Sequence, residues 1–461
     1  MNKSNILYSC LAIFVALLTI FDVSNSYAGE QSLSFEQAIK VAQKNDPWLD
    51  GSKHKQQSLE LLSYAANTQP DPKVSIALAN LPTNGFDFAQ EGMTQFKVGV
   101  SQMFARGDSL AIKNQQLQLQ SQEQPLQRQD RQNKVAVTVG SLWLDLYRVQ
   151  KSISLIEQNR NLFEQLSQLA EASYSSGLGK TRQHDIVRAQ LELTRLEDKL
   201  NQLKQEQSSY QGMLGQWLSD YTFNESSAEQ AHKKNNFLMT TVSSELPKLD
   251  LNKKFSVYDE KQLKTEQLAL ILSAHPAVQA IEKKVVSTHI EVDLAEQKYQ
   301  PQWGINASYG YRADDKMGKS RADLFSVGIV FDVPLFTDNR QDNEVKSAIS
   351  KTEAVKTEKL LLIRQLMSQF SSAKSSLLRL IERQILYKER LLPQIHDQAQ
   401  AYLTAYTNND GDFAEVVRAR IAELNAQIDF LAINVQQQKI ILEINYFLSG
   451  TRMQLQVGTE L

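Results

Sequence analysis

The chain has 461 residues, with 50 Lys and Arg against 52 Asp and Glu and a formal net charge of -2. This balance excludes the strongly basic surface that nucleic-acid binding requires, so no nucleic-acid partner is predicted. Hydrophobic residues make up 42% of the chain, which suits a folded protein, and the 18 Gly and 10 Pro are few enough to permit long helices.

The N-terminal segment 1–28 has the pattern of a secretory signal peptide. Lys3 supplies a positive n-region, and an apolar run covers residues 6–21. Small residues up to Ala28 then predict cleavage before Gly29. An uncleaved membrane anchor is the alternative.

The single cysteine, Cys10, lies inside the predicted signal peptide. The mature chain is therefore expected to contain no disulfide, no thiolate metal site and no lipid attached to sulfur. No later run of about 18 apolar residues predicts a transmembrane helix. An exported chain of this kind is expected in the periplasm, outside the cell, or in the outer membrane as a β-barrel.

Two stretches of the chain open in the same way. Residues 33–50 and 263–280 each carry Glu-Gln, then apolar residues at helical spacing, then a proline that ends the helix. The two glutamates of these openings, Glu36 and Glu266, are 230 residues apart. The repetition predicts an internally duplicated chain.

Four segments alternate apolar and polar residues with a period of two, at about 72–80, 94–104, 302–312 and 323–333. Each has about ten residues, the length of a tilted strand that spans a bilayer. One face is apolar and partly aromatic, and the other is mostly small or polar. The edge of a soluble β-sandwich shows the same alternation and is the alternative. Four strands are too few to close a membrane barrel, so strands from several subunits would have to combine.

Each pair of predicted strands is followed by a long helix and a return helix. The four helices are predicted at 108–175, 181–217, 339–406 and 413–448. At about 1.5 Å per residue, the longest would extend about 100 Å, which suits a protruding tube. A detached soluble coiled coil is the alternative, but it gives no reason for strands to precede each long helix.

The tips of the two helical hairpins also correspond, because Asp185 and Glu415 are again 230 residues apart. The second tip is a turn at 407–412, rich in Asn, Asp and Gly. The predicted organisation is a first repeat over 29–218, an equatorial linker over 219–260, a second repeat over 261–450 and a C-terminal tail over 451–461.

Several phrases along the chain occur in a characteristic order: the paired openings at 33–47 and 266–276, Val-Pro-Leu-Phe-Thr-Asp-Asn-Arg at 333–340, Leu-Leu-Pro-Gln at 391–394, and Glu-Val-Val-Arg-Ala at 415–419. With these phrases the mature chain resembles the TolC-like outer-membrane factor (outer membrane efflux protein) family, the exit ducts of tripartite efflux and type I secretion systems. The stretch 81–102 is similar to the heavy-metal cation-efflux branch of that family.

The resemblance implies an α+β membrane protein in the outer membrane of a Gram-negative cell. It implies a homotrimer in which four strands per protomer form a 12-stranded β-barrel, continued by a long periplasmic α-helical barrel. Outer-membrane lipid, a periplasmic adaptor (membrane fusion protein) and a proton-driven inner-membrane pump are the implied partners.

Passive passage of substrate is the implied function, with heavy-metal cations as cargo and no catalysis. Drug efflux or type I protein secretion are the alternatives within the family. A periplasmic coiled-coil adaptor is an alternative outside it, but such a protein would need lipoyl-like β segments, which are absent from the sequence. An exported hydrolase has no support.

Charged residues at the two tips are candidates for a channel gate: Asp185, Asp410, Asp412, Glu415 and Arg418. In a trimer each carboxylate would form a ring that attracts cations and sets an aperture. By resemblance, Glu415 occupies the position of a constricting acid, and Arg418 stands where some members have a second acid. Equally, the two aspartates suit ordinary turn positions, and Glu415 suits the start of a helix.

Two further groups of tip residues are candidates for contacts. An adaptor would meet the tips around Gly177, Gly179, Arg182, Asn408 and Gly411. Contacts that hold a closed state would use Tyr174, Arg188 and Tyr406, although packing on a helix surface explains these three equally well.

The six histidines form no recognisable metal-binding pattern. None pairs with another at a spacing of four residues, and His-Glu-x-x-His does not occur. His184 stands beside Asp185, where a solvated tip histidine is the simpler interpretation. No metal site, cofactor or catalytic constellation is predicted.

Overall fold

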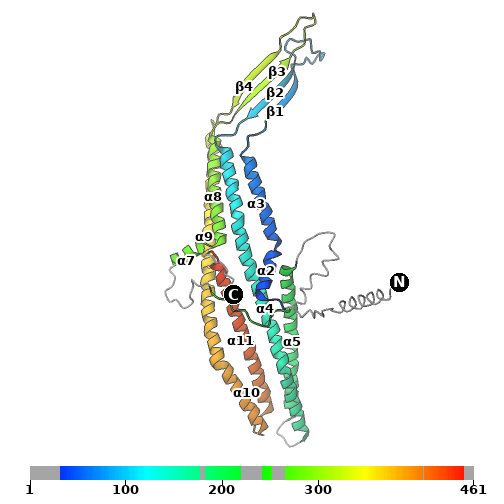
Figure 1. The fold of residues 1–461 in the computed structure, drawn as a ribbon, viewed down its shortest axis with the longest axis vertical. Helices are drawn as coiled ribbons and strands as arrows, with labels where there is room; N and C mark the ends of the chain where they lie inside the picture. Colours follow the sequence, from blue (N-terminus) through cyan, green and yellow to red (C-terminus); the bar gives the residue numbers. More distant parts are fainter. Residues whose placement is uncertain (1–31, 177–181, 220–240, 252–264, 409, 451–461) are drawn as a thin grey trace, which may run out of the picture.

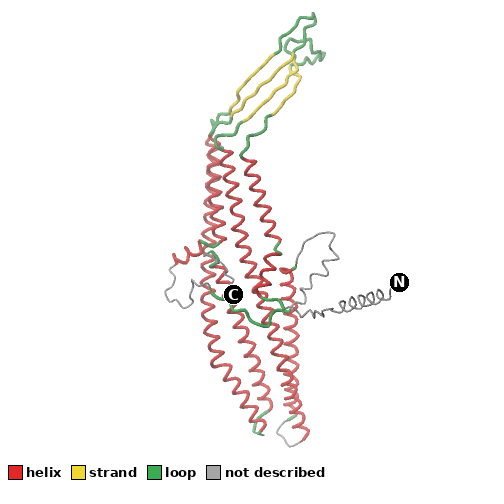
Figure 2. Tube along the Cα trace, viewed as in Figure 1, coloured by secondary structure: helices red, strands yellow, loops and turns green. Residues whose placement is uncertain are grey.

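The computed structural model describes residues 32–176, 182–219, 241–251, 265–408 and 410–450. The predicted signal peptide (1–28) and the C-terminal tail (451–461) lie outside the described residues, as do Gly177 and Gly179. The described chain is elongated, with a β-sheet at one end, two helical hairpin tips at the other, and helices between them (Figures 1 and 2).

One helix, α4 (Ser109–Ser176), runs from the sheet to the first tip (Figure 1). Its 68 residues correspond to about 100 Å of helix. Towards the sheet it packs against α3 (Pro47–Ala66) and α8 (Pro276–Glu296). Towards the tips it packs against α5 (Gln183–Leu218) and α11 (Phe413–Phe447). This helix therefore contacts both halves of the chain along its whole length.

The sequence predicted a single helix over 339–406 in the second half of the chain. The structure differs, because this column is not one regular helix. It consists of α9 (Gln341–Leu386), a π-helical turn η5 (Tyr387–Leu391) and α10 (Leu392–Thr407). Pro393 is the second residue after the π turn. Proline lacks the N–H that the helix ladder needs, and its ring clashes with the carbonyl four residues earlier, so the wider turn accommodates it.

Two short helices, α2 (Phe35–Lys44) and α7 (Thr265–Ser273), lie midway along the molecule, which we call the equator (Figure 1). Ser34 and Gln37 form a capping box at the start of α2, which satisfies two backbone donors. The first residues of α2 and α7 are 230 positions apart, as are those of α5 and α11. Two 3-10 turns, η3 (Gln297–Tyr299) and η4 (Thr337–Asn339), are also present.

The largest buried clusters surround the equator. Trp143 of α4 is fully buried, donates its indole N–H to the carbonyl of Leu33 at 2.9 Å, and meets the edge of Phe35. Part of the predicted linker crosses here as residues 241–251, and its Leu249 packs against both the first-half and the second-half cluster. The described part of this linker therefore contributes to the core, although the sequence predicted only a connection between the two repeats.

His275, the N-cap residue of α8, is fully buried at the equator. Its Nδ1 accepts a hydrogen bond from the Ala277 N–H at 3.2 Å, and its ring meets the edge of Tyr446 on α11. The Tyr446 hydroxyl donates to Asp130 of α4, which is also paired with Lys134. Burial lowers the pKa of His275 below its ordinary value, and the opposing effect of Asp130 is smaller.

The burial of His275 predicts a loss of stability in acid. Because its folded-state pKa is below the ordinary value of 6.5, stability present above that pH is lost as the pH falls through the folded-state pKa. The variant His275→Asn keeps an N-cap acceptor and removes the titration. Its melting temperature is expected to fall less than that of the wild type between about pH 6.5 and pH 5. Equal falls in both proteins would contradict this assignment.

The sheet has four antiparallel strands in the order β1-β2-β3-β4. The strands are β1 (Lys73–Ala79), β2 (Gln95–Met103), β3 (Trp303–Tyr311) and β4 (Leu324–Phe331). The first half of the chain supplies β1 and β2, and the second half supplies β3 and β4. Pairing of β2 with β3 joins the two halves in one sheet.

Candidate functional site

One face of the sheet is apolar across all four strands. The register aligns Ile76, Val98 and Tyr309 across β1, β2 and β3, and Tyr309 pairs with Phe325 on β4. Ile76 is 69% exposed and Phe325 is 71% exposed. The full set of large side chains on this face is Val74, Ile76, Leu78, Phe96, Val98, Val100, Trp303, Ile305, Tyr309, Tyr311, Phe325, Val327, Ile329 and Phe331. An exposed apolar surface of this extent requires an apolar partner.

Aromatic residues gather at the two ends of this apolar face, with aliphatic residues between them. Next to the helices, Trp303 pairs with Phe331 and stacks on Phe104 at 4.2 Å. At the loop end, Tyr311 pairs with Phe96 and stacks on Phe88. Aromatic belts that flank an aliphatic band are typical of strands in an outer membrane.

The opposite face of the sheet, which we call the polar face, carries mostly small and polar residues, with Met103, Leu324 and Val330 as its larger apolar side chains. Ser75, Gly99, Ser308 and Ser326 form one row across the four strands. A side chain at Gly99 would stand 2.8 Å from the Ser75 hydroxyl oxygen, so a larger residue there would displace that hydroxyl. The two faces therefore suit two different environments, one apolar and one aqueous.

Strands β1 and β4 are the edges of the sheet and have no strand partner on their outer sides within the described chain. They run antiparallel to each other, because each neighbouring pair in the four-stranded order is antiparallel. The edge β4 of one copy can therefore pair with β1 of the next copy in an ordinary antiparallel ladder. Open edges of this kind are either protected or paired with another chain.

The two loops beyond the sheet are fastened to each other. Lys316 forms an ion pair with Asp87 at 3.0 Å. The guanidinium groups of Arg312 and Arg321 donate to backbone carbonyls of the first loop, at Gly92 and Glu91. These contacts fix the relative position of loops that are more than 200 residues apart in the chain.

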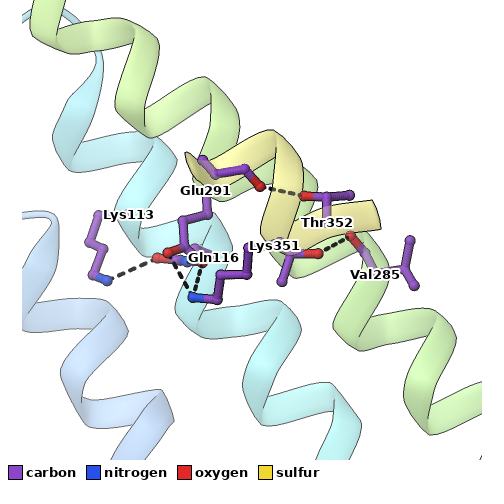
Figure 3. Close-up of polar contacts among 8 residues, drawn as sticks. Lys113, Gln116, Val285, Glu291, Lys351 and Thr352 are labelled. Carbon is purple, nitrogen blue, oxygen red and sulfur yellow. Dashed lines mark hydrogen bonds and ion pairs between the residues drawn. The ribbon is translucent and has the colours of Figure 1, made fainter. Parts of the chain in front are cut away.

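A polar network joins three helices below the sheet (Figure 3). Glu291 of α8 accepts hydrogen bonds from Lys351 of α9 at 2.7 and 2.8 Å. Gln116 of α4, which is buried, donates to the same carboxylate at 3.5 Å and accepts from Lys113. The network helps to hold the helices that support the sheet in fixed positions.

The predicted gate residues lie at the tips, where two of the aspartates cap helices. Asp412 is the N-cap of α11 and accepts from the Ala414 N–H at 3.0 Å. Asp185 is buried near the start of α5 and accepts from the Arg182 N–H at 2.8 Å, with the His184 ring 3.3 Å away. Both aspartates therefore contribute to helix capping within a single protomer.

The other charged tip residues are placed differently. Glu415 forms an ion pair with Arg418 one turn later, and both side chains are partly exposed. Asp410 is exposed, and its backbone N–H donates to the Ala405 carbonyl at 2.9 Å. Glu415 therefore carries a charge that Arg418 compensates, whereas the carboxylate of Asp410 points to solvent.

The predicted adaptor residues that are described lie on the tip turns. Gly411 is required by the turn itself, because a side chain there would stand 2.6 Å from the Tyr406 backbone nitrogen. Asn408 ends α10 and borders an open groove of about 540 Å³. The groove is lined by Asp397, Gln400, Ala401, Thr404, Ala405, Asn408 and Asp410.

The three predicted hairpin-contact residues have different surroundings. Tyr406 packs against Phe413 with ring centroids 5.4 Å apart, within a cluster that also contains Leu166 of the first hairpin. The Tyr174 side chain is 49% exposed, and Arg188 is exposed on α5. Cross-hairpin contacts of Tyr174 and Arg188 therefore remain a prediction.

Sequence reasoning missed two features of this architecture. The loop-to-loop contacts of Arg312 and Arg321 join segments whose proximity no local pattern reveals. The burial of His275 has a local signal, because it precedes Pro276 at a helix start, but its packing partners come from distant helices.

Among the described residues, no three His, Cys, Asp or Glu side chains are grouped as metal ligands require. Within that same part of the chain, no helix is long and apolar enough to cross a membrane.

The fold matches solved structures over nearly the whole chain. CmeC of Campylobacter jejuni, described as an outer membrane channel, has a TM-score of 0.71 at 12% identity and covers 90% of this chain and 85% of its own. The outer membrane protein VceC of Vibrio cholerae has a TM-score of 0.69 at 14% identity, with coverages of 90% and 95%. CusC, whose structures were described in terms of folding and transmembrane channel formation, has a TM-score of 0.69 at 13% identity, with coverages of 91% and 92%.

No known sequence family matches the chain, and no curated protein sequence does so. At 12–14% identity, the structural similarity establishes the fold. The chain has the α+β fold of outer-membrane channel proteins, in which a small antiparallel sheet is followed by long helical hairpins.

Proposed function

We propose that this chain is one protomer of an outer-membrane exit duct of a tripartite efflux system, of the TolC-like outer-membrane factor kind. The observation that carries the proposal is the sheet, which has one continuous apolar face, one polar face and two open edges. Closure of several such sheets into a barrel would bury every edge and turn the apolar face towards lipid.

A homotrimer is the assembly that we propose. Three copies supply 12 strands, whereas one copy has only the four strands of β1-β2-β3-β4. The helices would then continue the barrel as a periplasmic tube, with the tips of Asn408 and Arg182 directed towards an adaptor and an inner-membrane pump. Passage is passive, and energy comes from the pump.

The proposal includes three classes of cargo. The resemblance of the stretch 81–102 to the heavy-metal cation-efflux branch favours heavy-metal cations, and drug efflux or type I protein secretion are the alternatives. The pump and adaptor encoded beside this chain would separate these classes, because the pump selects the substrate.

Glu415 is the tip residue whose removal we expect to change the current through a closed tip. In planar bilayers, Glu415→Ala is expected to raise conductance or weaken block by divalent cations, because it removes a carboxylate ring. Arg418→Ala is expected to strengthen that block, because it frees the Glu415 carboxylate from its partner.

A matched control exists on α5, where Glu192 and Arg195 form an ion pair with the same spacing at 2.7 Å. Glu192→Ala is expected to leave conductance and block unchanged. Unchanged currents in both Glu415→Ala and Arg418→Ala would remove this pair from the gate.

A further inference from the structure

The charge on the polar face of the sheet has one sign. The four strands contain only two charged residues, Lys73 and Lys97, and no Asp, Glu or Arg. Both lysines belong to the face that carries Ser75 and Gly99, because they lie at odd-numbered positions of the same alternation. The polar face therefore has two positive charges per protomer and no negative charge of its own.

Lys97 is surrounded by small neutral neighbours. The register places it between Ala77 on β1 and Gly310 on β3. Lys73 lies opposite Ser101. The ammonium group of neither lysine forms a hydrogen bond or an ion pair with any residue in the described ranges. Both ammonium groups thus remain available to solutes.

The two lysines lie at different levels along the strands. Lys97 pairs with Ala77, which is four residues from Lys73 on β1, so the two levels are about 13 Å apart. The neighbouring carboxylates lie beyond the strand ends. Asp332 forms an ion pair with Arg106. Asp323 accepts hydrogen bonds from the Tyr309 hydroxyl and the Arg312 backbone N–H. Asp71 precedes Lys73 at the helical end, so Lys97 is the less compensated charge.

We propose that Lys73 and Lys97 make the sheet end of the duct an anion-attracting sleeve, whose preferred solutes carry carboxylate or phosphate groups. This inference rests on the proposed function, because the polar face must enclose the lumen. In a closed trimer each lysine becomes a ring of three ammonium groups, which concentrates anions and repels free divalent cations. Within the cargo classes above, the sleeve favours acidic organic solutes over bare metal ions.

The test uses the full-length protein in planar bilayers under a KCl gradient, where the reversal potential gives the ratio of chloride to potassium permeability. The double variant Lys73→Gln with Lys97→Gln is expected to lower this ratio by about threefold, because it removes the cationic rings. The double variant Lys73→Arg with Lys97→Arg keeps the charge and is expected to retain the wild-type ratio.

A second measurement reports on the sheet end even when the tip dominates the reversal potential. Inositol hexakisphosphate is added to each side of the bilayer in turn, and block of the current is recorded. We expect block of the wild type from the side of the loops, with about tenfold weaker block in the glutamine double variant and no loss in the arginine double variant.

The outcomes separate the two proposals. A conducting protein with the same permeability ratio and the same block in the glutamine double variant overturns the anion sleeve and leaves the duct intact. A wild type that neither inserts into the bilayer nor forms a stable trimer in lipid vesicles overturns the duct itself, and the sleeve with it.

Discussion

Val98→Arg is expected to prevent stable assembly of the protein in lipid vesicles. Val98 lies in the aliphatic band of the apolar face, between Ile76 and Tyr309. If this face contacts lipid, an arginine near the middle of the bilayer destabilises the barrel by about 2–4 kcal/mol per protomer. The measurement is the urea concentration at which the vesicle-bound protein loses its β-structure and its resistance to protease.

Ser308→Arg is the matched control, because it adds the same charge on the opposite face of the neighbouring strand. Ser308 lies between Gly99 and Ser326 on the polar face, where water would solvate the new guanidinium. We expect this variant to assemble like the wild type. If the two variants assembled equally well, the apolar face would not be the face that contacts lipid. The result would then favour the alternative in which the strands belong to a soluble β-sandwich.

Asp46→Ala is expected to give a large loss of stability in the helical region. Asp46 is the N-cap of α3 and is buried, accepting from the Trp48 N–H at 3.2 Å and from Arg131 Nε at 2.7 Å. The Arg131 guanidinium also lies over the rings of Trp48 and Trp217. Removal of the carboxylate leaves a cation between two aromatic rings without its partner and leaves α3 uncapped.

The expected loss is about 2–4 kcal/mol, below the range for a fully buried pair because Arg131 is partly exposed. The melting temperature of the helices, followed by circular dichroism, is the measurement. Asp46→Asn keeps the cap and loses the ion pair, so it is expected to lie between Asp46→Ala and the wild type. Asp50→Ala on the same helix breaks an exposed pair with Lys53 and is expected to change little. A melting temperature for Asp46→Ala equal to that of Asp50→Ala would contradict the assigned role.

The regular elements of this fold were predictable because their signals are local. Period-two alternation indicated strands that the structure places at Lys73–Ala79 and Trp303–Tyr311, and apolar spacing indicated long helices such as Ser109–Ser176. The turn chemistry around Gly411 likewise reflects contacts within a few residues. Local steric and hydrogen-bonding preferences act in the same direction as the fold in these segments.

The rest depended on contacts between distant segments. The pairing of β2 with β3 and the packing of Tyr446 on His275 join positions that are far apart in the chain. The sequence also did not predict the π turn before Pro393. A proline within a helical pattern indicates that the helix either kinks or ends, and the pattern does not distinguish these two outcomes. At the tips, Asp412 and Asp185 cap helices, and a gating role for either residue stays a prediction, because residue type alone does not separate the two roles.

The π turn at Tyr387–Leu391 makes the two halves of the chain mechanically unequal. The first column, α4, is a continuous rod from the sheet to the tip, and its own proline, Pro125, lies inside that helix. The second column has a joint, because the regular hydrogen-bond ladder that stiffens a helix is interrupted there. In the proposed trimer, three rods would alternate with three jointed columns. A change in the aperture at the tips would then bend three joints while three fixed supports keep the length of the tube constant.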